Sequence, residues 1–191
     1  MKMIFGLVFA LSGAAAFAQT YTVDTAATKV EWVGKKVSGE HRGSVNAKSG
    51  TLTLKGEEIT AGEVVVDMKS ISCSDITDKE TNGKFIGHIT SPDFFDTAKY
   101  PEAKILIKSS KKTAKGLEVT GDLTFIGQTH PITFLATDVK KTDKTVSAKA
   151  TVNVDRTKWG LKYGSGQFFK GLGDKMINDQ FTLNVTLEAK N

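Results

Sequence analysis

The stretch FTLNVTLEA, residues 181–189, decides the fold class of this chain. From Phe181 to Leu187 its apolar side chains occupy every second position, and threonine or asparagine fills the positions between them. Successive side chains of a strand point to opposite faces, so this pattern gives one dry face and one wet face. The stretch therefore predicts a strand of an antiparallel sheet that packs one face against an apolar interior.

The same period of two recurs along the chain. Examples are KVEWVGKKV (29–37), GEVVVDM (62–68) and PITFLATDV (131–139). These runs are rich in β-branched and aromatic residues, and turn-forming residues separate them at hairpin spacing. Their number indicates eight or nine strands, and the absence of a strand–helix–strand rhythm favours an antiparallel sheet. No composition break divides the chain, so we predict one domain.

Alternation alone does not distinguish a closed barrel from a sandwich of two sheets. It does argue against an outer-membrane barrel, whose strands carry lipid-facing apolar rows of about 9–11 residues between aromatic girdles. Here the runs are shorter and charges interrupt them. Aromatic residues make up only 8% of the sequence, too few for such girdles.

The N-terminus has the pattern of a cleaved signal peptide. Lys2 supplies a positive charge, an uncharged apolar run follows, and AFA (16–18) places small residues where a signal peptidase reads them. We predict a signal peptide over residues 1–18 and an exported domain over residues 19–191, periplasmic or secreted. The apolar run is too short for a membrane span, and no cysteine follows it to carry a lipid anchor.

The charge of the chain indicates which classes of partner to expect. The chain has 26 basic and 21 acidic residues, a net charge of +5, and Arg42 and Arg156 are its only arginines. Because the lysines are spread along the chain, we expect no nucleic-acid partner, only a transient attraction to anionic membrane surfaces.

Cys73 is the only cysteine, so an internal disulfide is excluded, and we interpret it as a small apolar residue at a strand end.

One break in the strand pattern lies between residues 74 and 101. TDKE (77–80) matches a capping box, with Thr77 as N-cap and Glu80 reaching back to it. Phe85 and Ile89 then stand four residues apart, on one face of the predicted helix.

The residues that follow predict a second short helical turn. Ser91 would cap it and Pro92 would take its first position. The adjacent rings of Phe94 and Phe95 would sit on this turn and face an apolar opening. We therefore interpret the whole segment as a lid.

Motifs for chemistry are absent. His41, His88 and His130 lie in different elements, without a second His or Cys at metal-ligand spacing, and we interpret them as surface or hairpin histidines. GSGQFFKGLGDK (164–175) has the glycine spacing of a phosphate loop but lacks its Lys-Ser/Thr pair, so we interpret it as a glycine-rich turn near a barrel mouth. We expect no metal, no cofactor and no catalytic set.

The order of several blocks resembles the YceI-like family of exported, polyisoprenoid-binding proteins. VDTAATKVEWVGKKVSGEHRGSV (23–45), HITSPDFFDTAKYPEAKI (88–105) and VTGDLTFIGQTHPITF (119–134) carry the resemblance, together with VNVDRTKWGLKYG (152–164) and GDKMINDQFTLNVTLEA (173–189). The resemblance implies a lipocalin-like antiparallel barrel of eight strands that holds one long apolar chain, such as an isoprenoid quinone precursor or a fatty amide. It also makes the segment around Phe94 and Phe95 a cap at the pocket mouth.

The residues and the resemblance together predict a lipid-binding carrier, not an enzyme. Its partner would be a long-chain isoprenoid or fatty amphiphile, and homodimer formation is left open. Two alternatives also stay open: a ligand-free module with a filled barrel, and a lipid-modifying enzyme whose histidines project inward beside a carboxylate. The ligand-binding candidates, chosen by size and pattern, are Trp32, Phe85, Phe94, Phe95, Phe125, Phe134, Trp159 and Phe168.

Overall fold

The structure, a computed structural model, describes residues 17–191. The predicted signal peptide therefore lies outside the described residues, except for Phe17 and Ala18. In chain order the described elements are β1 (Ala18–Val23), β2 (Lys29–Lys36), β3 (Gly39–Lys55), β4 (Glu58–Cys73), α1 (Lys79–Thr90), β5 (Glu102–Thr113), β6 (Gly116–Phe125), β7 (Gln128–Lys141), β8 (Thr145–Asp155), the 3-10 turns η1 (Arg156–Trp159) and η2 (Gly173–Lys175), and β9 (Ile177–Lys190).

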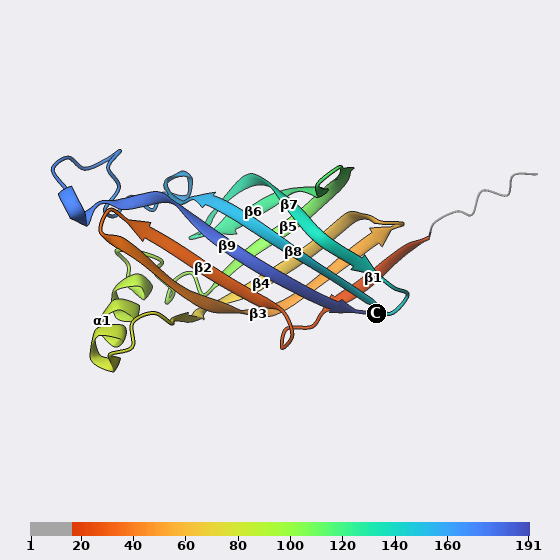
Figure 1. The fold of residues 1–191 in the computed structure, drawn as a ribbon, viewed down its shortest axis with the longest axis horizontal. Coiled ribbons are helices and arrows are strands. Elements are labelled where there is room, and N and C mark those ends of the chain that lie inside the picture. Colours follow the sequence, from red (N-terminus) through yellow and green to blue (C-terminus); the bar gives the residue numbers. More distant parts are fainter. Residues whose placement is uncertain (1–16) are drawn as a thin grey trace, which may run out of the picture.

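The strands form a closed antiparallel barrel (Figure 1). From β2 the order runs through β9, β8, β7, β6, β5 and β4 to β3, which pairs with β2 and closes the circle. β1 pairs with the far half of β3 and with the end of β9, so β1 and β2 share one position in the wall. The predicted barrel of eight strands is confirmed, and pairing all the way round excludes a sandwich.

A turn between β1 and β2 divides that shared position. The Asp24 carboxylate accepts the backbone N–H groups of Ala26 at 3.2 Å and Ala27 at 3.1 Å. Asp side chains bond in this way to the backbone that follows them and thereby stabilise turns. Thr28 is buried, and its hydroxyl donates to the Glu188 carbonyl at 3.2 Å. The chain thus makes a turn without leaving the wall.

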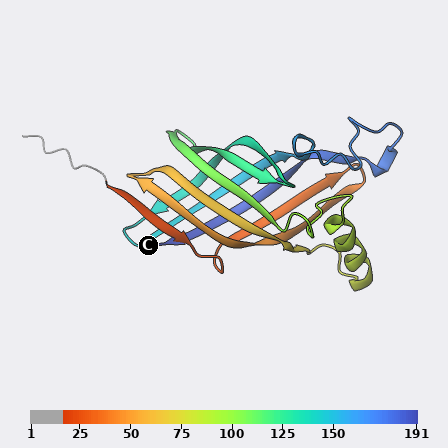
Figure 2. The same cartoon turned by 180° about the vertical axis from the view of Figure 1, so that it is seen from behind.

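The two ends of the barrel differ. One end of the barrel carries β1 and the C-terminus (Figures 1 and 2). A buried apolar cluster fills the interior toward this end. Tyr21 is fully buried there among Leu52 and Leu54, and its hydroxyl donates to the Thr142 carbonyl at 2.8 Å. The opposite end carries α1 and the loop between β8 and β9.

The structure corrects the predicted helix start by one residue. Asp78, not Thr77, is the N-cap, and its carboxylate accepts the Thr81 N–H at 2.9 Å. A carboxylate suits this position because it accepts a free amide and faces the positive end of the helix dipole. Glu80 forms an ion pair with Lys84 at 2.6 Å instead of reaching back to the cap.

The second predicted helical turn is not a helix. Ser91 ends α1, and residues 92–99 form successive turns. The Phe95 N–H donates to Ile89 O at 3.0 Å, which folds the segment back on the end of the helix. Asp96 has a φ of 45°, outside the helical region. No helix among residues 17–191 is long and apolar enough to cross a membrane.

Candidate functional site

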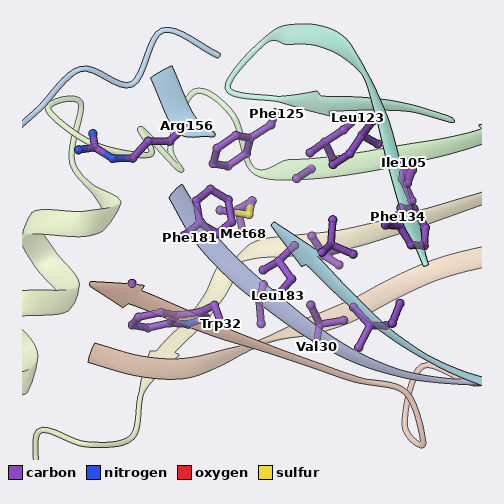
Figure 3. A pocket seen from close by; sticks show the side chains of 18 of the residues that line it. Val30, Trp32, Met68, Ile105, Leu123, Phe125, Phe134, Arg156, Phe181 and Leu183 are labelled. Atoms are coloured by element: carbon purple, nitrogen blue, oxygen red, sulfur yellow. The ribbon is translucent and has the colours of Figure 1, made fainter. Parts of the chain in front are cut away.

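The barrel encloses a cavity of about 540 Å³ (Figure 3). Every one of the eight wall positions contributes to its lining, and α1 adds Phe85 and Ile89, the two residues that the sequence placed on one helical face. The four alternating apolar side chains of β9 line it: Phe181, Leu183, Val185 and Leu187. The stripe that predicted the fold class is therefore part of the cavity wall.

Six of the eight predicted ligand-binding residues line this cavity. They come from three strands (β2, β6 and β7), from α1 and from the turns after it. Whether they touch a ligand stays a prediction. These six are Trp32, Phe85, Phe94, Phe95, Phe125 and Phe134.

The other two predicted residues lie outside the cavity wall. Trp159 is 3% exposed, and its indole N–H donates to the Leu123 carbonyl at 3.0 Å. Its ring packs edge-on against His130 at 5.2 Å, which makes it a core residue behind the wall. Phe168 is 45% exposed on the loop between β8 and β9, because the turns of that loop direct it toward solvent.

Aromatic rings connect the lid segment with the interior. Phe94 packs edge-on against Phe95 at 4.7 Å, Phe95 contacts Phe125 at 5.5 Å, and Phe125 contacts Phe181 at 6.0 Å. Such tilted and edge-to-face contacts are favourable geometries for aromatic pairs. This continuous row of rings provides an apolar surface from the mouth into the barrel.

Polar side chains border the cavity at the α1 end. Lys36 and Lys175 lie where β2 meets the start of β9. His41, in the β2–β3 hairpin, and His88, on α1, are both half-buried and also line the cavity. Periodicity did not indicate this, because α1 and the strand ends bring both rings inward.

His41 belongs to a hydrogen-bonded cluster that sequence spacing did not reveal. Its Nδ1 lies 2.8 Å from Oδ2 of Asp75, and the Cys73 thiol donates to Oδ1 of Asp75 at 3.2 Å. The possible metal-ligand atoms of His41, Cys73 and Asp75 lie within 4.8 Å of one another, as metal ligands do. The hydrogen bonds from His41 and Cys73 to Asp75 account for this arrangement. Burial raises the pKa of the Cys73 thiol, so at neutral pH this group is a thiol and a poor nucleophile.

Asp75 lies in the connection that leads into α1, and its hydrogen bonds to His41 and Arg42 tie this connection to β3. Desolvation raises the pKa of its carboxyl, but hydrogen bonds from the Arg42 backbone N–H, His41 and Cys73 outweigh that effect and lower the pKa to about 2. A carboxyl with a depressed folded-state pKa contributes stability above its unfolded pKa and loses it as pH falls.

We expect Asp75→Asn to reduce the free energy of unfolding at pH 7 by about 1–2 kcal/mol, allowing for solvent screening of a partly exposed group. This difference from the parent protein should shrink as pH falls from about 4 to 2, where the parent carboxyl takes up its proton. Urea unfolding across this range measures it. The other carboxyls titrate in both proteins, so a difference that stays constant with pH would contradict the role of Asp75.

A closed antiparallel barrel with one blocked end, an apolar cavity and aromatic rings at its mouth is the architecture of a barrel-type binding protein. The family model described as YceI-like domain matches residues 21–189. The chain therefore belongs to the YceI-like family.

Relatives and solved structures agree with this assignment. A UPF0312 protein of Pseudomonas putida (strain GB-1) is 40% identical over 90 residues, 46% of this chain, and another from Pseudomonas savastanoi pv. phaseolicola is 40% identical over 89 residues. The chain aligns with only 44% of the length of each of these relatives.

Two solved structures share the fold at low identity. BcnA of Burkholderia cenocepacia has a TM-score of 0.66 at 22% identity, and the match covers 87% of this chain and 99% of BcnA. A polyisoprenoid binding domain from Saccharophagus degradans has a TM-score of 0.61 at 14% identity, covering 92% and 98% of the two chains.

Proposed function

We propose that the protein is a periplasmic or secreted carrier that holds one long-chain amphiphile inside its barrel. Residues 1–18 would be removed on export, and residues 19–191 would form the binding domain. The ligand would be a polyisoprenoid, an isoprenoid quinone or a fatty amide. The observation that carries this proposal is the apolar cavity of about 540 Å³ inside a closed wall.

The size of the cavity suits such a chain. It lies within the range of roughly 300–1,000 Å³ that is usual for small-molecule sites. At roughly 30 Å³ for each water-sized group, it holds on the order of 20 carbon atoms. A chain of about 20 heavy atoms at about 0.3–0.4 kcal/mol each gives roughly 6–8 kcal/mol, near micromolar affinity without any ion pair.

The asymmetry of the barrel suggests how the ligand lies. The end near Tyr21 is closed, so the apolar tail would point toward it. Lys36, Lys175 and His88 border the cavity at the other end, where a polar headgroup would meet donors and water. The polyisoprenoid binding domain of Saccharophagus degradans has the same fold and supports a prenyl chain as the class of tail.

The open cavity argues against the filled-barrel alternative. The enzyme alternative has one observation in its favour, because His41 lines the cavity and lies 2.8 Å from a carboxylate oxygen of Asp75. Cys73, however, donates to Asp75 and not to the imidazole, and its raised pKa disfavours the thiolate. A carrier therefore explains the site better than a lipid-modifying enzyme.

Native mass spectrometry on protein purified from its own envelope tests the proposal. We expect the mass of the chain from Gln19 plus one class of long-chain amphiphile, which denaturation releases intact. The carrier proposal fails if only the ligand-free chain is found and added prenyl and fatty chains do not bind. Chemical conversion of an added chain by the parent protein, but not by a His41→Ala variant, would favour the enzyme instead.

A further inference from the structure

Large apolar side chains on the outside of the molecule gather at the cavity mouth. Among the described residues six such side chains are exposed, and four of them lie at this end. Val37, at the tip of the β2–β3 hairpin, donates its N–H to the Met176 carbonyl at 3.1 Å and so lies beside the loop between β8 and β9. We call these four residues the rim patch: Val37, Tyr163, Phe168 and Phe169.

The loop holds the two phenylalanines outward by a defined set of bonds. Ser165 is fully buried, and its carbonyl accepts the N–H groups of Phe168 at 3.2 Å and Phe169 at 3.0 Å. The Ser165 hydroxyl accepts the Gln167 N–H at 3.2 Å. Phe168 and Phe169 remain 45% and 49% exposed. Exposing adjacent phenyl rings to water is unfavourable in free energy, so such a patch indicates a contact surface.

Basic side chains are frequent in the same loop. Between residues 157 and 176 the charged residues are four lysines and Asp174, a net charge of +3. The Lys162 ammonium group lies over the Phe168 ring, 4.8 Å from its centroid. Aromatic rings interspersed with lysines match the interface of an anionic bilayer, where rings enter the headgroup layer and lysines meet phosphates. All four lysines are exposed: Lys158, Lys162, Lys170 and Lys175.

We propose that the rim patch and these four lysines dock the cavity mouth onto an anionic phospholipid bilayer. Tyr163 and Lys175 belong to this surface and also line the cavity. The Tyr163 ring packs against His88 at 4.8 Å, and His88 contacts Phe94 at 5.9 Å, so the surface continues into the lid segment. A docked barrel would pass an apolar chain to the bilayer without exposing it to water. This purpose rests on the proposed carrier function, but the docking itself does not.

Vesicle co-sedimentation of residues 19–191 without added ligand tests the docking. We expect binding to phosphatidylcholine vesicles that contain about 30% phosphatidylglycerol, and binding at least roughly tenfold weaker to pure phosphatidylcholine. Raising the salt from about 0.05 M to about 0.5 M should weaken it similarly, because screening shortens the reach of the lysines. A variant with all four lysines changed to glutamine should lose both dependences.

Phe168→Ser combined with Phe169→Ser should weaken vesicle binding by roughly tenfold or more, because the rings no longer enter the interface. Leu106→Ser is the matched control, since Leu106 is 46% exposed on β5, away from the mouth, and should leave binding unchanged. Neither phenylalanine lines the cavity, so binding of a fluorescent fatty-acid analogue in solution should persist in the double variant.

Several outcomes would overturn the docking proposal. They are equal binding of the double variant and the parent protein, equal binding to neutral and anionic vesicles, and conversion of a parent dimer to a monomer by the double variant without any vesicle binding. The last outcome would assign the patch to a second copy of the chain. If the parent protein docks but does not bind the fatty-acid analogue, the docking surface stands and the carrier function fails.

Discussion

Ala150→Trp should abolish most ligand binding while the barrel stays folded. Ala150 lies on β8 and lines the cavity between Ala136 and Val185, its partners on the neighbouring strands. An indole there takes the place of about nine ligand carbon atoms, which at about 0.3–0.4 kcal/mol each corresponds to roughly a hundredfold loss of affinity. Because the ring enters open space, it should not disrupt the packing that closes the far end.

Fluorescence titration with a prenyl or fatty probe measures this loss, and urea unfolding checks the fold. The matched control is Thr151→Trp, because Thr151 is the next residue on β8 and its exposed side chain points outward, where it donates to Asn184 at 3.3 Å. The control should bind within about twofold of the parent protein, as is usual for surface substitutions. Unchanged binding by the Ala150 variant would place the ligand outside the cavity.

Arg156→Met should destabilise the fold more than any other change discussed here. The Arg156 side chain is 3% exposed, and its guanidinium donates to four backbone carbonyls at 2.8–3.1 Å. Desolvation lowers its pKa, opposed by the charges of Asp179 and Asp155. Methionine fills similar space but leaves the carbonyls without donors. The four acceptors belong to Leu161, Tyr163, Ile177 and Asn178.

The expected loss is about 3–5 kcal/mol of the free energy of unfolding, typical of breaking a buried charged network. Urea unfolding measures it, with the exposed Lys158→Met as a control that should change by less than about 0.5 kcal/mol. Arg156→Lys should recover only part of the loss, because an ammonium group cannot reproduce the planar fork. A loss below about 1 kcal/mol for the methionine variant would mean that the loop between β8 and β9 keeps its structure without the guanidinium.

Much of the fold was predictable because its signal is local. The alternation from Phe181 to Leu187 depends only on neighbouring residues, and the structure places that stripe on the cavity wall. Phe85 and Ile89 were paired by helical spacing in the same way. The two errors in the lid segment were also local: Asp78 was the better cap than Thr77, and the positive φ of Asp96 is incompatible with a second helical turn.

The sequence by itself determined the class of fold and the apolar character of the interior, since side-chain period and burial preference are properties of short segments. Only the tertiary structure decided which large side chains face the cavity, and so separated Phe134 from the core-packed Trp159. It alone brought His41 to Asp75, 34 residues away, and surrounded Arg156 with carbonyls from two segments. These outcomes depend on strand register and loop closure between distant residues, which no local pattern encodes.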